Sequence, residues 1–180
     1  MNARMKIILA IDPGANGGLA VDYWGRVEAW KLASSEAQRV DDIRQIVGTA
    51  EVEGCDMIAV IEHVGGHVGR PQPGCDMFNF GRGVGNLIGA LLYAEQLTGR
   101  VWHREVAPQV WQKIYGLGKA SACASQSEWK RKLKAEAQRR FPHLNVTLAT
   151  ADALLILEWA RRLGEGLKSH GNTPEEKSHR

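Results

Sequence analysis

Two short apolar segments that each end in a carboxylate constrain the fold of this chain most strongly. Residues 5–11 directly precede Asp12, and residues 57–62 close on Glu62. Apolar runs of this length predict buried β-strands. Between them, residues 36–53 have the apolar spacing of a helix, and a strand–helix–strand crossover makes the second strand parallel to an existing one. We therefore expect the two carboxylates to lie at the ends of adjacent strands.

The rest of the pattern predicts an α/β domain built on one mixed sheet. Two further strands are expected on either side of a tight turn at Trp24 and Gly25, which would give an antiparallel meander. The expected sheet has three antiparallel strands and then two parallel ones, with helices flanking it. We place this domain at residues 1–163 and expect a flexible tail at residues 164–180. The remaining expected elements are strands at 17–23, 26–30 and 101–106, and helices at 77–97, 127–141 and 150–163.

The composition agrees with a globular domain and excludes some classes of protein. The chain has 180 residues, of which 44% are hydrophobic and 24% are charged. It has no apolar run of the roughly 18–20 residues that a membrane span requires, and its N-terminus lacks the pattern of a signal peptide. Its three cysteines, Cys55, Cys75 and Cys123, are far apart, which favours reduced thiols and a cytoplasmic location.

The charge of the chain is unevenly distributed. The net charge is only +3, yet residues 100–140 contain ten Lys or Arg against three Glu. Clustered basic residues favour a polyanionic partner such as nucleic acid, because they replace the counterions condensed along a phosphate backbone. A solvated helix face would produce the same run of charges, so the pattern alone leaves both interpretations open.

A third carboxylate, Asp152, opens the last helical pattern and is followed by a wholly apolar stretch. Taken singly, each acid has a structural explanation: Asp12 in a turn, Glu62 in a salt bridge, and Asp152 at a helix start. Taken together, carboxylates from two strand ends and a helix start would form an oxygen-rich site suited to Mg²⁺. Two such ions can clamp a phosphodiester for attack by water, so we interpret the chain as a metal-dependent nuclease.

Several short motifs, in this order and spacing, resemble the RuvC-type Holliday junction resolvases of the ribonuclease H-like superfamily. The similarity is greatest to the branch that contains phage and chloroplast resolvases. It implies a ribonuclease H-like fold and a cytoplasmic setting in a bacterial or phage-infected cell. The motifs are at residues 11–14 with 17–20, 61–63, 80–85, 108–111 and 151–156.

This resemblance implies an activity and assigns roles to residues. Members of the family are homodimers that cut two opposing strands of a four-way DNA junction symmetrically, with Mg²⁺ or Mn²⁺. Asp12 would bridge both ions, Glu62 would bind one ion and Asp152 the other, and water would be the nucleophile. Lys119, in a glycine-rich connector, would lie near the scissile phosphate and stabilise developing charge.

The same resemblance, together with the charge distribution, suggests residues that contact DNA. Phe80 could stack on bases at the junction centre or could belong to the core. The basic helix at 127–141 could follow the phosphate backbone or present a solvated face. The glycine-rich segment at 81–92 could pack against a second copy or against the sheet. The residues expected to contact DNA are Arg70, Phe80, Arg82, Lys130, Arg131 and Lys134.

One departure from the family pattern concerns a fourth metal ligand. The family has an acid or histidine a few residues before the last carboxylate, whereas here the corresponding stretch, 145–151, has no acid. Substitutes could be Asn145, Thr147, Thr150 or His143, or the ligand could be absent at Ala149. The departure keeps a second hypothesis open, namely a junction-binding protein with weak or no cleavage.

Two other activities compete with these hypotheses. A ribonuclease H-like nuclease could act on other branched DNA or on RNA–DNA hybrids. The glycines after Asp12 also loosely resemble a phosphate loop of sugar kinases, but a single domain of this length lacks the second lobe that such enzymes need.

Overall fold

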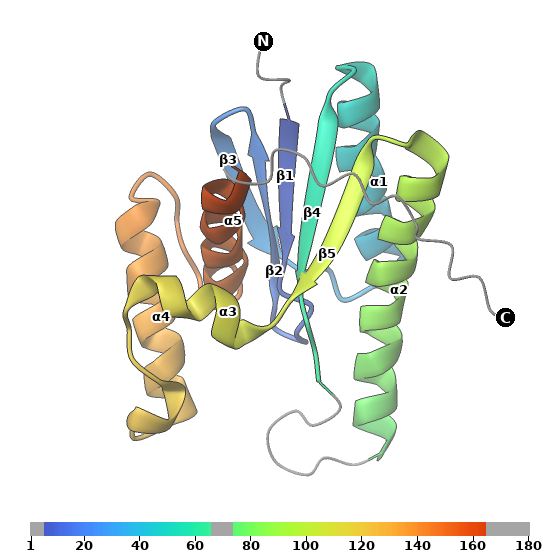
Figure 1. Ribbon diagram of the computed structural model, residues 1–180. Helices are drawn as coiled ribbons and strands as arrows, with labels where there is room; N and C mark the ends of the chain where they lie inside the picture. Colours follow the sequence, from blue (N-terminus) through green and yellow to red (C-terminus); the bar gives the residue numbers. More distant parts are fainter. Residues whose placement is uncertain (1–5, 66–73, 165–180) are drawn as a thin grey trace, which may run out of the picture.

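The computed structural model describes residues 6–65 and 74–164 and contains one mixed sheet covered by helices on both faces (Figure 1). The strands are β1 (Lys6–Ile11), β2 (Gly18–Tyr23), β3 (Arg26–Lys31), β4 (Asp56–Glu62) and β5 (Val101–Val106). The helices are α1 (Glu36–Val52), α2 (Gly74–Thr98), α3 (Pro108–Gln112), α4 (Gln126–Arg140) and α5 (Ala151–Gly164), with 3₁₀ turns η1 (Lys113–Tyr115) and η2 (Ala120–Ala122).

The sheet has the expected composition of three antiparallel and two parallel strands. Its order is β3-β2-β1-β4-β5, with antiparallel pairs β1/β2 and β2/β3 and parallel pairs β1/β4 and β4/β5. In the register of the central pair, Ile11 lies opposite Ile61. The next residue on each strand, Asp12 and Glu62, is therefore brought to the same edge of the sheet, as the two apolar segments predicted.

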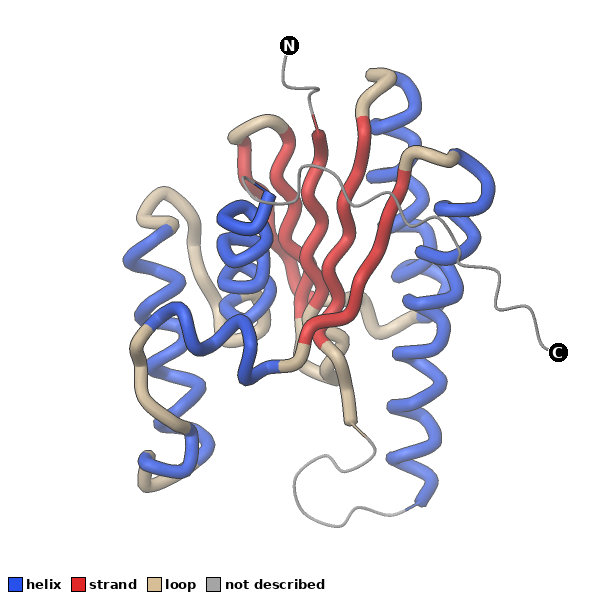
Figure 2. Tube along the Cα trace, in the orientation of Figure 1, coloured by secondary structure: helices blue, strands red, loops and turns tan. Residues whose placement is uncertain are grey.

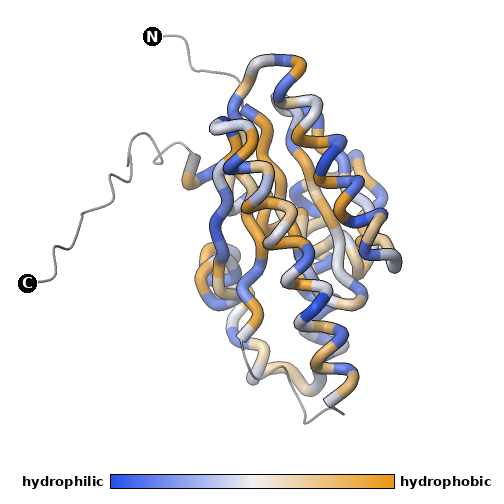
Figure 3. The backbone as a smooth tube through the Cα atoms, turned by 90° about the vertical axis from the view of Figure 1, so that its right-hand side faces the viewer, coloured by the Kyte–Doolittle hydropathy of each residue, from blue (hydrophilic) through white to orange (hydrophobic). Residues whose placement is uncertain are grey.

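Alternation along the central strand divides the core into two layers. Ile7, Leu9 and Ile11 pack on the face covered by α1 and α2, whereas Ile8 and Ala10 pack on the face covered by α4 and α5. Figure 2 shows these helices on either side of the strands, and Figure 3 shows hydrophobic stretches following the strands through the interior. Because side chains alternate with period two, one strand serves both layers.

The turn between β1 and β2 is built on two glycines that approach backbone atoms closely. A Cβ at Gly17 would lie 2.0 Å from the carbonyl oxygen of Asp12, and a Cβ at Gly18 would lie 2.5 Å from that of Ala149. Gly18 and Asp12 exchange two backbone hydrogen bonds, of 2.9 and 3.1 Å. These glycines therefore hold Asp12 at the strand end and let the segment before α5 pack beside it.

The structure differs from the expectations in a few boundaries. Helix α2 begins at Gly74, three residues before the expected start at 77, and its glycines do not interrupt it. The connector at 116–124 contains the short turn η2. Helix α5 ends at Gly164, and the rest of the expected tail, 165–180, lies outside the described residues. All three cysteines are unpaired, and none of the helices in the described ranges could cross a membrane.

Candidate active site

The three carboxylates meet where β1 and β4 end and α5 begins, at the lower end of the sheet in Figure 1. A cavity of about 920 Å³ opens at this edge, and Asp12 and Glu62 line it together with Lys130 of α4. Its other walls come from the β1–β2 turn and from the starts of α1, α2 and α3. The carboxyl ends of strands and the amino ends of helices thus surround one hollow.

Asp12 is only 7% exposed, and the backbone N–H of Gly14 donates to its Oδ1 at 3.1 Å. This is the side-chain-to-backbone hydrogen bond of a turn, which is the structural explanation that the sequence offered for Asp12. Burial and the nearby negative charge of Asp152 raise the pKa of Asp12, with Lys130 and the Gly14 N–H acting in the opposite direction. Asp12 therefore stabilises the turn through its side chain, while burial and Asp152 disfavour its charged form at the cavity.

Glu62 accepts a hydrogen bond from a tryptophan and does not form an ion pair with a basic side chain of the described residues. The indole N–H of the fully buried Trp111 donates to Glu62 Oε2 at 2.9 Å. Among residues 6–65 and 74–164, Glu62 forms no salt bridge, so the expected structural alternative is not present there. Burial, followed by the charges of Asp12 and Asp152, raises the pKa of Glu62 to about 8.

Asp152 is 3% exposed and uses only one of its two oxygens. The ammonium of Lys130 donates to Oδ2 at 2.5 Å, while Oδ1 is buried without a hydrogen-bond partner. Burial opposes the charged form of Lys130, but Asp152, and more weakly Asp12 and Glu62, raise the pKa of its ammonium. A buried carboxylate oxygen without a partner costs free energy, which a cation beside it would offset.

These observations test whether the site suits the divalent metal that the sequence predicted. The donors are hard carboxylate oxygens, their charges repel one another, and one oxygen lacks a partner, all of which favour Mg²⁺ or Mn²⁺. As the side chains lie, however, no three His, Cys, Asp or Glu in the described ranges are gathered tightly enough to hold an ion. Instead, the Lys130 ammonium supplies the positive charge beside Asp152. The chemistry of the donors therefore fits Mg²⁺ or Mn²⁺, while their positions in the structure are not those of an assembled metal site.

None of the candidates for a fourth ligand lines this cavity. Thr147 and Thr150 bond to each other at the start of α5, with their hydroxyl oxygens 3.2 Å apart. The His143 ring packs edge-on against Phe141, and Asn145 is exposed. The backbone of Ala149 lies against Gly18. This segment therefore serves to cap α5 and to pack it on β2.

The residues expected to contact DNA divide into two groups. Lys130 and Phe80 line the cavity, and Phe80 belongs to neither buried core cluster. Arg82 is exposed and pairs with Glu36 at 2.8 Å, away from the cavity lining. Arg131 borders a smaller recess beside Lys130, and Lys134 is partly exposed on the same helix.

Two more predicted residues lie apart from the carboxylates or outside the structure. Lys119 is exposed just before η2 and does not line the cavity. Arg70 lies outside the described residues. Roles for both stay predictions.

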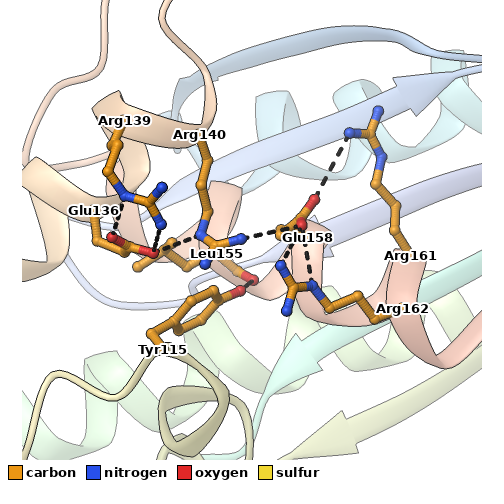
Figure 4. A network of polar contacts seen from close by, with 8 residues as sticks. All are labelled: Tyr115, Glu136, Arg139, Arg140, Leu155, Glu158, Arg161 and Arg162. Carbon is orange, nitrogen blue, oxygen red and sulfur yellow. Dashed lines mark hydrogen bonds and ion pairs between the residues drawn. The ribbon is translucent and has the colours of Figure 1, made fainter.

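A network of polar contacts joins α4, α5 and the 3₁₀ turn η1 (Figure 4). Arg140 of α4 bonds to Glu136 on its own helix at 2.6 Å and reaches Glu158 of α5 at 3.3 Å. The Tyr115 hydroxyl donates to the Leu155 carbonyl of α5. Lys130 and Asp152 lie on the two helices that these contacts join.

Sequence reasoning missed two residues of the site. Trp111 is fully buried in the core, and the target of its N–H depends on the packing of α3 beside β4. Arg39 also lines the cavity, although the pattern of α1 drew attention only to its apolar face. The involvement of Trp111 could have been anticipated, because the N–H of a buried indole usually has a hydrogen-bond acceptor.

The raised pKa of Glu62 predicts an unusual effect of pH on stability. Without metal, the unfolded state releases the Glu62 proton near pH 4.5, while the native state retains it up to about pH 8. Native stability is therefore full below pH 4.5 and falls by up to about 1.4 kcal/mol per pH unit as the pH rises to 8. Glu62→Gln should melt at a higher temperature than wild type at pH 8 in a chelator, with the gap closing at pH 4.5. Glu51→Gln, at an exposed position, should have the melting temperature of the wild type at both pH values. A Glu62→Gln variant that is less stable at pH 8 would contradict this.

The Trp111–Glu62 bond predicts a second effect, on metal affinity. Trp111→Phe keeps an aromatic ring in the buried site but removes the N–H donor. Loss of a group that orients a ligand typically lowers metal affinity by about 10–100-fold, so the Kd for Mn²⁺ should rise by about tenfold or more. Calorimetry at pH 8 measures this, with Trp102→Phe at a 46% exposed position as the matched control. Equal Mn²⁺ affinity in both variants would show that the bond does not orient Glu62.

The fold has counterparts among solved structures. A structure of Thermus thermophilus RuvC matches with a TM-score of 0.54 and 18% identity, covering 88% of this chain and 96% of that one. A structure of T. thermophilus RuvC in complex with Holliday junction substrate matches with a TM-score of 0.54 and 16% identity, covering 89% and 96%. No protein-family model matches the chain, and no curated protein matches it in sequence. With its mixed five-stranded sheet and flanking helices, the chain has a RuvC-like, ribonuclease H-like fold.

Proposed function

We propose that this protein is a structure-selective endonuclease that resolves four-way DNA junctions by metal-dependent hydrolysis. The observation that carries the proposal is the convergence of Asp12, Glu62 and Asp152 at one edge of the sheet, with a buried oxygen of Asp152 lacking a partner. The likeness to T. thermophilus RuvC, one of whose structures contains a Holliday junction, supports the choice of a branched DNA substrate.

The carboxylates would act by holding cations and orienting the reacting groups. Asp12, Glu62 and Asp152 would hold Mg²⁺ or Mn²⁺, which supplies positive charge at the phosphodiester and favours attack by water. Trp111 keeps one Glu62 oxygen in a fixed orientation. Lys130 adds a cation beside Asp152 that can also face a phosphate, since it lines the cavity. The chain thus contributes positioning and charge.

The DNA strand would enter the cavity between helices of the two layers. Phe80 of α2 and Lys130 of α4 line this cavity, where a base could stack and a phosphate could bind. Arg131 and Lys134 continue the basic surface along α4. Lys119 would approach the substrate from the connector before α4.

Helix α2 supports the proposal of a homodimer. Gly81, Gly85 and Gly89, spaced four residues apart, are exposed, and a Cβ on any of them would meet nothing within 4 Å. These glycines therefore do not serve packing on the sheet, which was one of the two expected explanations. Phe78 and Tyr93, which are 67% and 68% exposed, lie on the same helix. An exposed apolar face with small residues suits close packing against a second copy, and two copies would match the symmetry of a four-way junction.

A junction-binding protein with weak or no cleavage is the second candidate. The observation that favours it is the start of α5, where Thr147 and Thr150 bond to each other and Ala149 offers no ligand. The ion associated with Asp152 would then be held weakly. Ala149→Asp distinguishes the two candidates, because a large gain in cleavage implies an incomplete site in the wild type.

The junction-cleavage assay tests the proposed function. A labelled immobile four-way junction with Mg²⁺ should yield paired symmetric nicks, and Asp12→Asn should reduce cleavage by more than about 100-fold because it removes a charged ligand. Asp41→Asn, which changes an exposed ion pair on α1, is the matched control. A linear duplex, another branched DNA and an RNA–DNA hybrid test selectivity. Tight junction binding without cleavage in Mg²⁺ and Mn²⁺ would favour the second candidate.

The homodimer has its own test. Gly85→Glu adds a charge to the exposed face of α2 and should convert a dimer to a monomer in analytical ultracentrifugation. Gly48→Glu changes a helical glycine of α1 that likewise has nothing within 4 Å of an added Cβ, so this control should remain dimeric. A wild type that is monomeric at tens of micromolar, or a dimeric Gly85→Glu, would exclude this interface.

A further inference from the structure

Arg39 places a second basic group in the cavity, from the layer opposite to Lys130. It lies in the first turn of α1, on the side of the sheet covered by α1 and α2, whereas Lys130 lies on α4 on the other side (Figure 1). Both side chains line the same hollow as Asp12 and Glu62. The cavity therefore has a cation on the wall of each helical layer.

Backbone carbonyls hold the Arg39 guanidinium in place. Its Nε donates to the carbonyl of Ala33 at 2.5 Å, and one terminal nitrogen lies 3.5 Å from the carbonyl of Ser34. The side chain is half-buried. These contacts fix the planar group while leaving N–H donors of its terminal nitrogens for another acceptor, since a guanidinium carries five.

A glycine of α2 makes room for this guanidinium. A Cβ added at Gly83 would lie 2.9 Å from the other terminal nitrogen of Arg39, so the end of this flexible side chain would have to shift. In contrast, Gly81, Gly85 and Gly89 on the same helix face open space. Glycine at position 83 therefore leaves the space that the Arg39 guanidinium occupies against α2, and we call this position the seat of Arg39.

The charge of Arg39 is not neutralised by a carboxylate. Among residues 6–65 and 74–164 it forms no ion pair, whereas its neighbours Arg82 and Arg44 pair with Glu36 and Asp41. A guanidinium stays charged at any ordinary pH. A fixed cation that has donors to spare and lines a cavity beside metal-ligand candidates is suited to a phosphate.

We propose that Arg39, seated on Gly83, is a phosphate-binding subsite for the DNA strand that enters the cavity. It would hold a backbone phosphate on the α1–α2 side while the scissile phosphate lies at the carboxylates. The proposal rests on the proposed function for the identity of the ligand as a nucleic acid strand. It also reassigns the phosphate contact on this side of the site from Arg82, which is paired with Glu36, to Arg39.

The salt dependence of junction binding tests the subsite without any cleavage. Affinity of the full chain for a four-way junction is measured in Ca²⁺ between 50 and 200 mM salt. Loss of one phosphate contact should reduce the slope of log K against log salt by about 0.9. Arg39→Gln should show this reduction with a several-fold weaker affinity at low salt. Arg44→Gln, on the same helix and of equal charge change, should keep the wild-type slope. Equal slopes in the two variants would overturn the proposal.

A second variant separates position from charge. Gly83→Ala retains every charge and favours the helix, but its Cβ displaces the guanidinium. It should weaken junction binding several-fold while the melting temperature stays the same or rises. If Gly83→Ala binds the junction with wild-type affinity, the proposal that Gly83 positions Arg39 is wrong. If the wild type binds single-stranded or duplex DNA with an Arg39-dependent slope but does not prefer junctions, the subsite stands and the junction function fails. Absence of DNA binding altogether would overturn both.

Discussion

Asp12, Glu62 and Asp152 bring three mutually repelling carboxylates together at one edge of the sheet. Asp12 and Asp152 are almost fully buried. On top of the effect of burial, the charge of Asp152 raises the pKa of Asp12, and the charges of Asp12 and Asp152 raise the pKa of Glu62. Such an arrangement costs stability in the absence of a compensating cation. In the structure that cation is the Lys130 ammonium, which reaches only one oxygen of Asp152. A divalent cation bound beside the carboxylates would offset the remaining negative charge.

The scaffold around the carboxylates limits how they can move apart. Gly17 and Gly18 fix the turn that ends β1, Trp111 holds Glu62, and polar contacts join the helices that carry Lys130 and Asp152. Each of these comes from a different part of the chain. The site is therefore built on elements at the edge of the sheet, and Arg39 and Phe80 line the same cavity.

The order of elements and the meeting of the carboxylates could be predicted because both follow from local patterns. The apolar runs ending at Asp12 and Glu62 predict parallel strands, and the parallel register places their ends together. Other features depend on tertiary geometry. The Trp111 N–H finds Glu62 only through the packing of α3, and Lys130 reaches Asp152 only because α4 lies beside α5. The exposure of three glycines on α2, and the burial of Gly83 under Arg39, likewise cannot be read from glycine content alone.

We propose that the three carboxylates form a binding site for divalent metal. Paramagnetic broadening of backbone amide signals by substoichiometric Mn²⁺ measures this most directly, since it locates the ion without reference to catalysis. If the ion binds there, the amide signals around Asp12, Glu62 and Asp152 broaden first, together with those of Gly14 and the start of α5, and added Mg²⁺ restores them. Broadening centred elsewhere, or none at millimolar Mn²⁺, would contradict it.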